Sequence, residues 1–439
     1  MKKVFRFFVL GAAIVLALSC FTACTSAKKS TQLAKPTPTE PLTYQERKNA
    51  AFDDIKQSAE LFASKFTYET YKDYDNSKNF AVSPVSVYMA LALSAECAAG
   101  DTRNELLSTL NVSYPVLESQ FSDFYRSLIA EYKYDGKVIG RLDLSNSIWV
   151  DKSAQPKDAC IQALADKYYG YSYSADFRLE NKAANKAIRD FVKEHTHGLI
   201  DQDFQLPART LFALINTLYL KDVWNGSGAD LPFTAEKYNF TKRDGTAKEL
   251  NLLQGSYIMG RTVETETFRH YYTQTKNGYK IKFILPNEGY SIDEIFTEEN
   301  LSTVNALTDY GAIDEKNKIE YYTRCLFPEF SAEYNKDVKH VLKSAFGVNK
   351  FFTPDECDFS TLTDDGVFCE KVQHVTKLAV DKTGVEGAAV TIVAMGPTSA
   401  PPEPEYEKVF EDFIVDGAFG FILTDRYGVT LFSGVVNQV

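Results

Sequence analysis

The strongest restriction on the fold of this chain comes from a run of small and β-branched residues, Gly384–Thr391, that leads into a proline-rich segment. Successive side chains of a strand point to opposite faces. One face of a strand here would carry small, mostly apolar side chains: Val385, Gly387, Ala389, Thr391 and Val393. Glu386 would point the other way, toward water. The run is therefore suited to enter a packed interior.

The segment after this run cannot continue as a central strand. Pro397, Pro401 and Pro402 lack a backbone N–H and end a hydrogen-bonded ladder. Neither lysine nor arginine lies between Gly384 and Glu407. A strand-forming segment that ends in an exposed, proline-bounded loop predicts a loop that is cut at its far end and then inserted.

Length and charge restrict the class of protein. The chain has 439 residues, enough for a large core, with 44% hydrophobic and 24% charged residues, as in soluble globular proteins. Its formal charge of −11 argues against nucleic acid as a partner, because phosphate binding needs a basic face.

The N-terminus resembles a bacterial lipoprotein signal over residues 1–23. A basic start, Met1–Arg6, precedes an apolar stretch, Phe7–Ser19, that is short for a membrane span. Ala23 then precedes Cys24, which the resemblance makes the lipidated residue and the mature N-terminus. Cys20 is the alternative, and plain secretion with an ordinary cleavage site stays open. We expect export across the inner membrane and a lipid anchor at the bacterial surface.

Residues 24–44 are rich in proline and predict a flexible tether that holds the folded part away from a membrane. Five cysteines remain beyond the signal, namely Cys97, Cys160, Cys325, Cys357 and Cys369. Their wide spacing and odd number fit neither a disulfide framework nor a zinc site. Cys357 and Cys369 could pair, but buried free thiols are the favoured interpretation.

Helical periodicity dominates the first half of the chain and strand patterns the second half. The patterns predict helices over 45–66, from Pro84 and over 182–195, and strands over 142–150, 211–220, 280–285, 318–322, 419–423 and 429–432. Ser83 precedes Pro84 as a candidate helix N-cap. This order predicts an α+β fold rather than repeating βαβ units.

Six segments, in order along residues 45–439, resemble the serpin family of suicide protease inhibitors. They are Asn79–Ser86 with Ala90-Leu91, Gly100–Thr102, Asn216–Lys221 with Trp224, Phe327–Phe330, Leu342–Gly347, and His374 ten residues before Gly384. The resemblance implies a single α+β domain with helices on a large, mostly antiparallel central sheet, two further sheets and an exposed reactive-centre loop near 382–405.

The resemblance also implies roles for individual residues. The hinge of the loop would comprise Lys382, Gly384, Val385, Glu386, Gly387, Ala388, Ala389, Val390 and Thr391. The reactive bond would join Thr398 to Ser399, with Met395 as a second cleavage point. A polar cluster where the sheet parts would contain Ser83, Ser86, Asn216 and His374, with Trp224 near the top of the opening.

The predicted target is a serine protease that accepts a small residue, because Thr398 follows Pro397 and no basic residue is near. Elastase-like or subtilisin-like enzymes fit, and a papain-like cysteine protease stays open. A non-inhibitory serpin that acts as a surface binding protein is the main alternative, since Lys382 occupies a position that is usually acidic in the family. We expect a monomer without cofactor.

An enzyme is the other class considered. The chain has five histidines and lacks the Gly-x-Ser-x-Gly, His-Glu-x-x-His and P-loop motifs. His195 and His197 are the nearest approach to a metal-ligand pair, but no third ligand is apparent in the sequence. We therefore predict neither an enzymatic activity nor a metal site.

Overall fold

The computed structural model describes residues 30–225, 230–386 and 406–439. Its helices are α1 Tyr44–Asn49, α2 Asp53–Lys72, α3 Pro84–Cys97, α4 Gly100–Thr109, α5 Tyr114–Leu128, α6 Asp158–Lys167, α7 Asn181–His195, α8 Ile292–Ile295, α9 Glu298–Ala306 and α10 Lys339–Phe346. A 3₁₀ turn covers Lys350–Phe352. Within these ranges, no helix is both long and apolar enough to cross a bilayer.

The strands differ widely in length, from two residues in β18 to 15 residues in β4. They are β1 Ser30–Ala34, β2 Phe80–Val82, β3 Ala130–Tyr134, β4 Lys137–Asp151, β5 Gly170–Ala175, β6 Phe212–Val223, β7 Tyr238–Thr241, β8 Ala247–Leu250, β9 Leu253–Gln254, β10 Ile258–Met259, β11 Val263–Glu264, β12 Phe268–Gln274, β13 Lys280–Pro286, β14 Ile313–Asp314, β15 Ile319–Phe327, β16 Phe330–Asp337, β17 Cys369–Asp381, β18 Gly384–Val385, β19 Glu407–Ile414, β20 Phe419–Thr424 and β21 Thr430–Val436.

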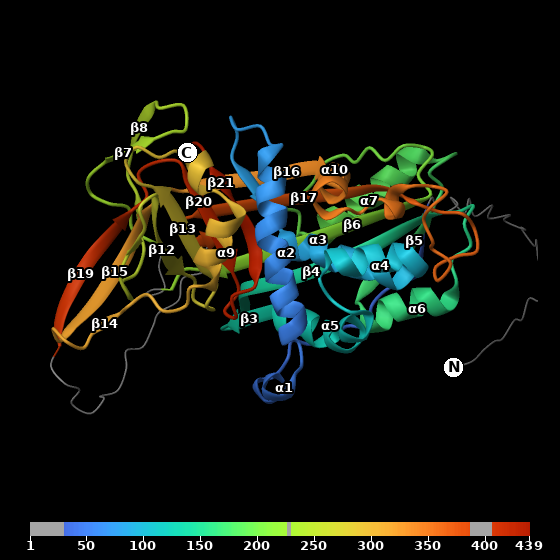
Figure 1. Ribbon diagram of the computed structural model, residues 1–439, viewed down its shortest axis with the longest axis horizontal. Helices are drawn as coiled ribbons and strands as arrows, with labels where there is room; N and C mark the ends of the chain where they lie inside the picture. The colour runs from blue at the N-terminus through green and yellow to red at the C-terminus, as the bar shows by residue number, and fades with distance from the viewer. Residues whose placement is uncertain (1–29, 226–229, 387–405) are drawn as a thin grey trace, which may run out of the picture.

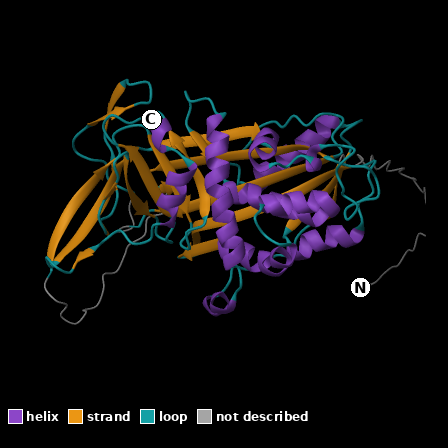
Figure 2. Ribbon diagram, viewed as in Figure 1, coloured by secondary structure: helices purple, strands orange, loops and turns teal. Residues whose placement is uncertain are grey.

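In the described part of the chain, 14 strands form one continuous hydrogen-bonded system in the order β1-β5-β4-β6-β18-β17-β16-β2-β21-β20-β13-β12-β11, with β3 beside β4. A second sheet contains β9, β10, β14, β15 and β19, and β7 pairs with β8. Figure 1 shows the sheet of β15 and β19 projecting at one end of the molecule, and Figure 2 shows most helices gathered at the other end and the centre. The predicted α+β fold with a large central sheet and two further sheets is confirmed.

Strand β6 is buried on both faces, which explains its nearly continuous apolar sequence. Leu214 and Leu218 face the main core, which also holds the buried helix α3. Ala213 and Ile215 face a second cluster that contains Phe191 of α7. The centre of the sheet is thus held between helices on both sides, so it resists opening except where a strand can be added.

Two local predictions differ from the structure. The helix predicted over 45–66 is divided into α1 and α2 by extended backbone at Ala50. Ser83 precedes α3 as predicted, but its side chain makes no capping hydrogen bond. Its backbone N–H donates instead to His374, because α3 starts directly beneath the central sheet.

The structure contradicts the tether prediction at residues 30–34 and at Leu42. Ser30–Ala34 forms β1, which pairs antiparallel with the outer edge of β5. Further along, the backbone N–H of Leu42, a buried residue, donates to Arg126 O at 3.1 Å. The unpaired backbone groups of an edge strand offer a pairing site that local sequence does not reveal. Residues 24–29, and with them Cys24, lie outside the described residues.

Candidate loop-insertion site

Of the predicted hinge, Gly384 and Val385 lie inside the central sheet as strand β18. Strand β18 runs antiparallel to both of its neighbours, β6 and β17. Gly384 pairs with Val223 and Asp381, and Val385 pairs with Asp222 and Val380. The chain therefore begins an additional strand between β6 and β17 before the loop is reached.

We call the boundary between β6 and β17 the seam, with its top at β18. The base of the seam, at the opposite end, is closed. From Phe212 to Asn216, β6 pairs directly and in parallel with β17, from Cys369 to His374. Between this closed part and β18 lie Thr217–Lys221 of β6 and Val375–Ala379 of β17. These two described stretches do not pair with each other through their backbones. The seam thus has a filled top, an open middle and a closed base.

The chain leaves the sheet at Glu386. Its φ of +80° lies in the left-handed region, which an L-residue other than glycine seldom adopts. Its backbone N–H still donates to Ala379 O at 2.6 Å, and its carboxylate is hydrogen-bonded to Tyr219. Such a conformation costs on the order of 1 kcal/mol or more, and the cost is released if Glu386 becomes extended.

Close backbone packing explains the residue types in β18. A Cβ atom on Gly384 would lie 2.0 Å from Asp222 O, so a larger residue cannot occupy this position without displacing the strand. Val385 is 1% exposed and belongs to the main core. Asp222 itself is buried, which raises the pKa of its carboxyl to about 6, and it accepts hydrogen bonds from Asn277.

Trp224 and Lys382 lie at the top of the seam. The indole N–H of Trp224 donates to Asp381 O at 2.7 Å, and its ring packs against Phe327. Lys382 Nζ lies 2.9 Å from Asp230 Oδ2, and this hydrogen-bonded carboxylate raises the pKa of Lys382. Lys382, at a position that is usually acidic in the family that the sequence resembles, thus has an acidic partner here.

The Lys382–Asp230 ion pair is exposed, so we expect it to contribute little to stability. Lys382→Asp and Asp230→Lys should each change the free energy of unfolding slightly, and the double exchange should restore it. A double-mutant cycle measured by urea unfolding should give a coupling energy that does not differ from zero within the error of the measurement, as for many exposed pairs. A coupling energy clearly larger than that error would show that this pair holds the hinge in place.

Four predicted residues meet in one buried polar cluster at the boundary between the open and closed parts of the seam. The backbone N–H of Ser83 donates to His374 Nε2 at 3.0 Å, and Ser86 Oγ donates to Asn216 Oδ1 at 3.0 Å. His374 Nδ1 lies 3.3 Å from Asn216 Oδ1. Because Nε2 accepts, Nδ1 carries the proton and the ring is neutral. Helix α3 thereby contacts both β6 and β17 at the point where the two strands begin to pair.

Burial lowers the pKa of His374 to about 3, so this residue is expected to make the protein acid-sensitive. The unfolded chain binds a proton near pH 6.5 and the folded chain does not, so stability is complete above pH 6.5 and falls as pH drops toward 3. The slope is about 1.4 kcal/mol per pH unit. We expect His374→Gln to lower the free energy of unfolding at pH 7. At pH 5 the difference in this free energy between the variant and the parent protein should be smaller by about 2 kcal/mol.

Urea unfolding of the two proteins at both pH values measures this change. The exposed His340 supplies a matched control, because His340→Gln should leave the pH dependence as it is in the parent protein. Equal acid slopes for the parent and His374→Gln would contradict the assignment.

Several predicted site residues lie outside the described residues: Gly387, Ala388, Ala389, Val390, Thr391, Met395, Thr398 and Ser399. The sequence analysis missed Asp222 and Asp230, which pair with the hinge backbone and with Lys382. An acid two residues after the apolar run 211–220 was the available signal for Asp222. Asp230 had none, because its pairing depends on the tertiary fold.

His195 and His197, the nearest approach to a metal-ligand pair in the sequence, each have a partner within the fold. His197 Nε2 lies 2.7 Å from Asp143 Oδ2, and His195 Nδ1 lies 2.8 Å from Phe191 O. Among the described residues, no three His, Cys, Asp or Glu side chains form a metal-binding group. The observed pairings explain both histidines as structural residues.

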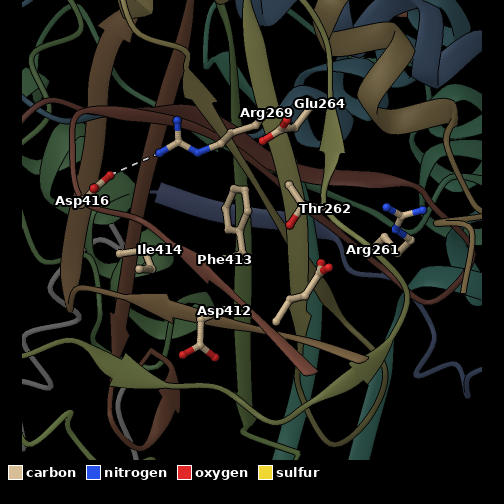
Figure 3. A pocket seen from close by; sticks show the side chains of 9 residues that line it. Arg261, Thr262, Glu264, Arg269, Asp412, Phe413, Ile414 and Asp416 are labelled. Atoms are coloured by element: carbon tan, nitrogen blue, oxygen red, sulfur yellow. Dashed lines mark hydrogen bonds and ion pairs between the residues drawn. The ribbon is translucent and has the colours of Figure 1, made fainter. Parts of the chain in front are cut away.

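The hollow in Figure 3 lies beside β19 and has a volume of about 660 Å³. Its lining residues are Arg261, Thr262, Glu264, Arg269, Glu411, Asp412, Phe413, Ile414 and Asp416. Arg269 and Asp416 form an ion pair across it at 3.4 Å. Two arginines and four carboxylates line its wall, and the lining residues include neither a histidine nor a cysteine.

The arrangement defines a class of protein whose central sheet holds, as a short strand between two long ones, the residues that lead into a predicted reactive-centre loop. The family model described as "Serpin (serine protease inhibitor)" matches residues 58–439, and the chain belongs to the serpin family. Members of this family are generally protease inhibitors rather than proteases.

Three similar proteins illustrate the range of the family. The chain is 25% identical over 360 residues to an alpha-1-antiproteinase of Callosciurus caniceps, covering 79% of this chain and 82% of that one. The native thermophilic serpin Tengpin has a TM-score of 0.69 at 24% identity, covering 94% and 100% of the two chains. Thyroxine-binding globulin in complex with thyroxine has a TM-score of 0.71 at 21% identity, covering 88% and 99%.

Proposed function

We propose that this protein is a suicide inhibitor of serine proteases that traps the acyl-enzyme by inserting its cleaved loop between β6 and β17. The observation that carries the proposal is β18, which already lies between these strands and is antiparallel to both. Because β18 precedes the predicted reactive-centre loop directly, the loop can extend an existing strand without a costly nucleation step.

The register of β18 predicts how insertion proceeds. If the same pairing continues, Glu386–Val390 enter the open middle of the seam, opposite Thr217–Lys221 and Val375–Ala379. Thr391 then reaches the level of Asn216 and His374, where β6 and β17 are paired directly. Further insertion must break those pairs, so the polar cluster marks the point at which the sheet has to part.

The small side chains of the hinge keep the barrier to insertion low. Each added backbone hydrogen bond contributes about 1 kcal/mol, so roughly ten of them supply on the order of 10 kcal/mol before ordering entropy is subtracted. A serine protease forms an ester with Thr398 and releases Ser399. Insertion of roughly 14 residues at about 3.3 Å each then carries the protease about 46 Å. Trapping requires this movement to be faster than ester hydrolysis.

The test is complex formation with an elastase-like or subtilisin-like serine protease. We expect a covalent complex that survives SDS and contains the chain up to Thr398, with the peptide that starts at Ser399 released and identified by mass spectrometry. A clipped chain without complex, for several serine proteases, would falsify the proposal. Complex formation with a papain-like cysteine protease alone would move the target to that class.

The residue before the reactive bond should set the target. Thr398→Arg is expected to raise the rate of complex formation with trypsin by more than about 100-fold, because the S1 pocket of trypsin holds an acidic residue. The same change should lower the rate with elastase. Second-order rate constants measured under pseudo-first-order conditions check both, and Met395→Arg serves as the control at the second candidate position.

A non-inhibitory binding role is the rival proposal. Thyroxine-binding globulin, solved in complex with thyroxine, shows that a chain with this fold can bind a ligand. The main argument for that role was Lys382, a basic residue at a position that is usually acidic. The ion pair of Lys382 with Asp230 weakens this argument, because the top of the seam keeps an ion pair. The two roles differ in the gel assay above, since a binding protein gives only clipped chain.

We further propose that the protein acts at the bacterial surface, anchored through a lipid on Cys24. The support is the signal-like sequence of residues 1–23. Mass spectrometry of the membrane-extracted protein should find an acylated N-terminal Cys24, and Cys24→Ala should release the protein into the medium. An acyl group on Cys20 instead would shift the cleavage site.

A further inference from the structure

Two buried thiols lie face to face in the part of the fold that borders the closed half of the seam. Cys97 is the last residue of α3 and Cys160 lies in the first turn of α6. Their sulfur atoms are 3.9 Å apart, and the side chains are 0% and 3% exposed. The other described cysteines, Cys325, Cys357 and Cys369, have no such sulfur neighbour. The sequence analysis considered only Cys357 and Cys369 as a pair.

Helix α3 crosses beneath the seam, whereas α6 belongs to one side of it. Helix α6 leads into β5 after only Tyr168 and Tyr169, and β5 is joined to β6 through β4 in the sheet. Helix α3 follows β2 after only Ser83, and β2 pairs with β16 and β21 on the far side of β17, while the rest of α3 also contacts β4 and β6. A link from α3 to α6 therefore ties the side of β4, β5 and β6 to a helix whose start is held on the far side, across the boundary that must move when β6 and β17 separate.

The contact lies close to the level at which separation begins. Gly170, the first residue of β5, is in the same row of the sheet as Asn146, Asn216 and His374. Leu93 of α3 packs so closely on Gly170 that a Cβ atom there would lie 2.5 Å from its side chain. One turn further along α3, Cys97 meets Cys160.

The contacts between α3 and the region of α6 are non-covalent in this structure. Glu96, beside Cys97, accepts a hydrogen bond at 3.1 Å from Tyr168, the residue after α6, and such a bond can break and re-form. Adding one strand to the closed half of the seam moves its two sides apart by one strand spacing, about 4.8 Å. A disulfide holds its two Cβ atoms within about 4.5 Å of each other, so it allows far less displacement.

We propose that Cys97 and Cys160 are a disulfide site, and that the oxidised protein, restrained across the seam, inserts its loop more slowly and becomes a poorer inhibitor. The functional part of this proposal rests on the proposed function above. The oxidant is a disulfide, either oxidised glutathione or the disulfide of a thiol–disulfide oxidoreductase, that acts while the chain folds and both thiols are still accessible.

The reaction consists of two exchanges. The Cys160 thiolate attacks one sulfur of the oxidant, forming a mixed disulfide and releasing one thiol. The Cys97 thiolate then attacks the Cys160 sulfur and releases the second thiol. The two S–H bonds of the protein are replaced by one S–S bond, and the oxidant is reduced to two thiols that carry the two protons.

The experiment compares full-length protein refolded with oxidised glutathione and with dithiothreitol. Peptide mapping after alkylation should find Cys97 linked to Cys160 only in the oxidised sample. We expect the number of inhibitor molecules consumed per protease trapped to rise at least threefold on oxidation and to return after reduction. Cys160→Ala should show no oxidation effect, whereas Cys325→Ala, a change at another buried cysteine, should show the full effect.

A folded oxidised sample without the linked peptide would overturn the proposal, and so would a linked sample with unchanged inhibition. A second measurement separates this proposal from the proposed function. The loop is nicked by a protease in trace amounts, and the gain in heat resistance is followed with time. If the reduced protein traps no protease, the proposed function fails, and the rate of this gain in linked and reduced protein decides the disulfide proposal alone.

Discussion

Val385→Arg is expected to convert the protein from an inhibitor into a substrate. Val385 is 1% exposed between β6 and β17, and a guanidinium group in this apolar position would be buried without a partner. The cost of several kcal/mol exceeds what two residues of strand contribute, so β18 should leave the sheet. We expect the yield of SDS-stable complex to fall more than about tenfold, while the rate of loop cleavage stays near that of the parent protein.

Glu386→Arg is the matched control. Glu386 lies at the exit from the sheet with its side chain partly exposed, so an arginine there keeps its contact with water. Complex yield should remain within about twofold of the parent, because no charge is buried. Equal losses for both variants would mean that charge near the loop, rather than burial in the seam, causes the defect.

Cleavage of the loop is expected to raise the temperature of unfolding strongly. The freed segment adds roughly ten backbone hydrogen bonds and relieves the strained conformation of Glu386, which together contribute on the order of 10 kcal/mol. For a domain of this size, with an unfolding entropy of about 0.8 kcal/mol/K, we expect an increase of roughly 10 °C in the unfolding temperature. Calorimetry of intact and nicked protein measures the difference.

The Val385→Arg variant supplies the internal control for this measurement. It should be cleaved at the same bond but gain little heat resistance, because its hinge cannot re-enter the seam. If nicked parent protein melts at the temperature of the intact protein, insertion does not occur and the trapping mechanism is wrong.

Local sequence patterns predicted the elements that are buried on both sides. The apolar run 211–220 became β6, and the pattern of 142–150 lies inside the longer β4. Both succeed because burial dictates their composition over a whole strand. Ser83 shows the limit of the method, because its residue type favours a helix cap while the structure directs its backbone to His374.

Contacts between distant segments explain what the sequence did not predict. The edge strand β1 depends on β5, and the ion pair of Lys382 depends on Asp230, in each case through the tertiary fold alone. The polar cluster of Ser83, Ser86, Asn216 and His374 was predicted only through resemblance to a family. The Cys97–Cys160 contact was missed because it depends on the tertiary fold, and the spacing of the two cysteines along the chain carries no information about it.

The position of β1 determines which strand forms one edge of the central sheet. A long sheet with a bare outer strand can recruit the same strand of a neighbouring molecule, and repeated recruitment leads to aggregates. Here β1 covers the outer side of β5, so a second molecule cannot pair with β5 unless β1 first detaches, and β1 itself becomes the edge. That edge has only five residues and a register shift between Gln32 and Ala34, and short, irregular edge strands are poor templates for a neighbouring chain.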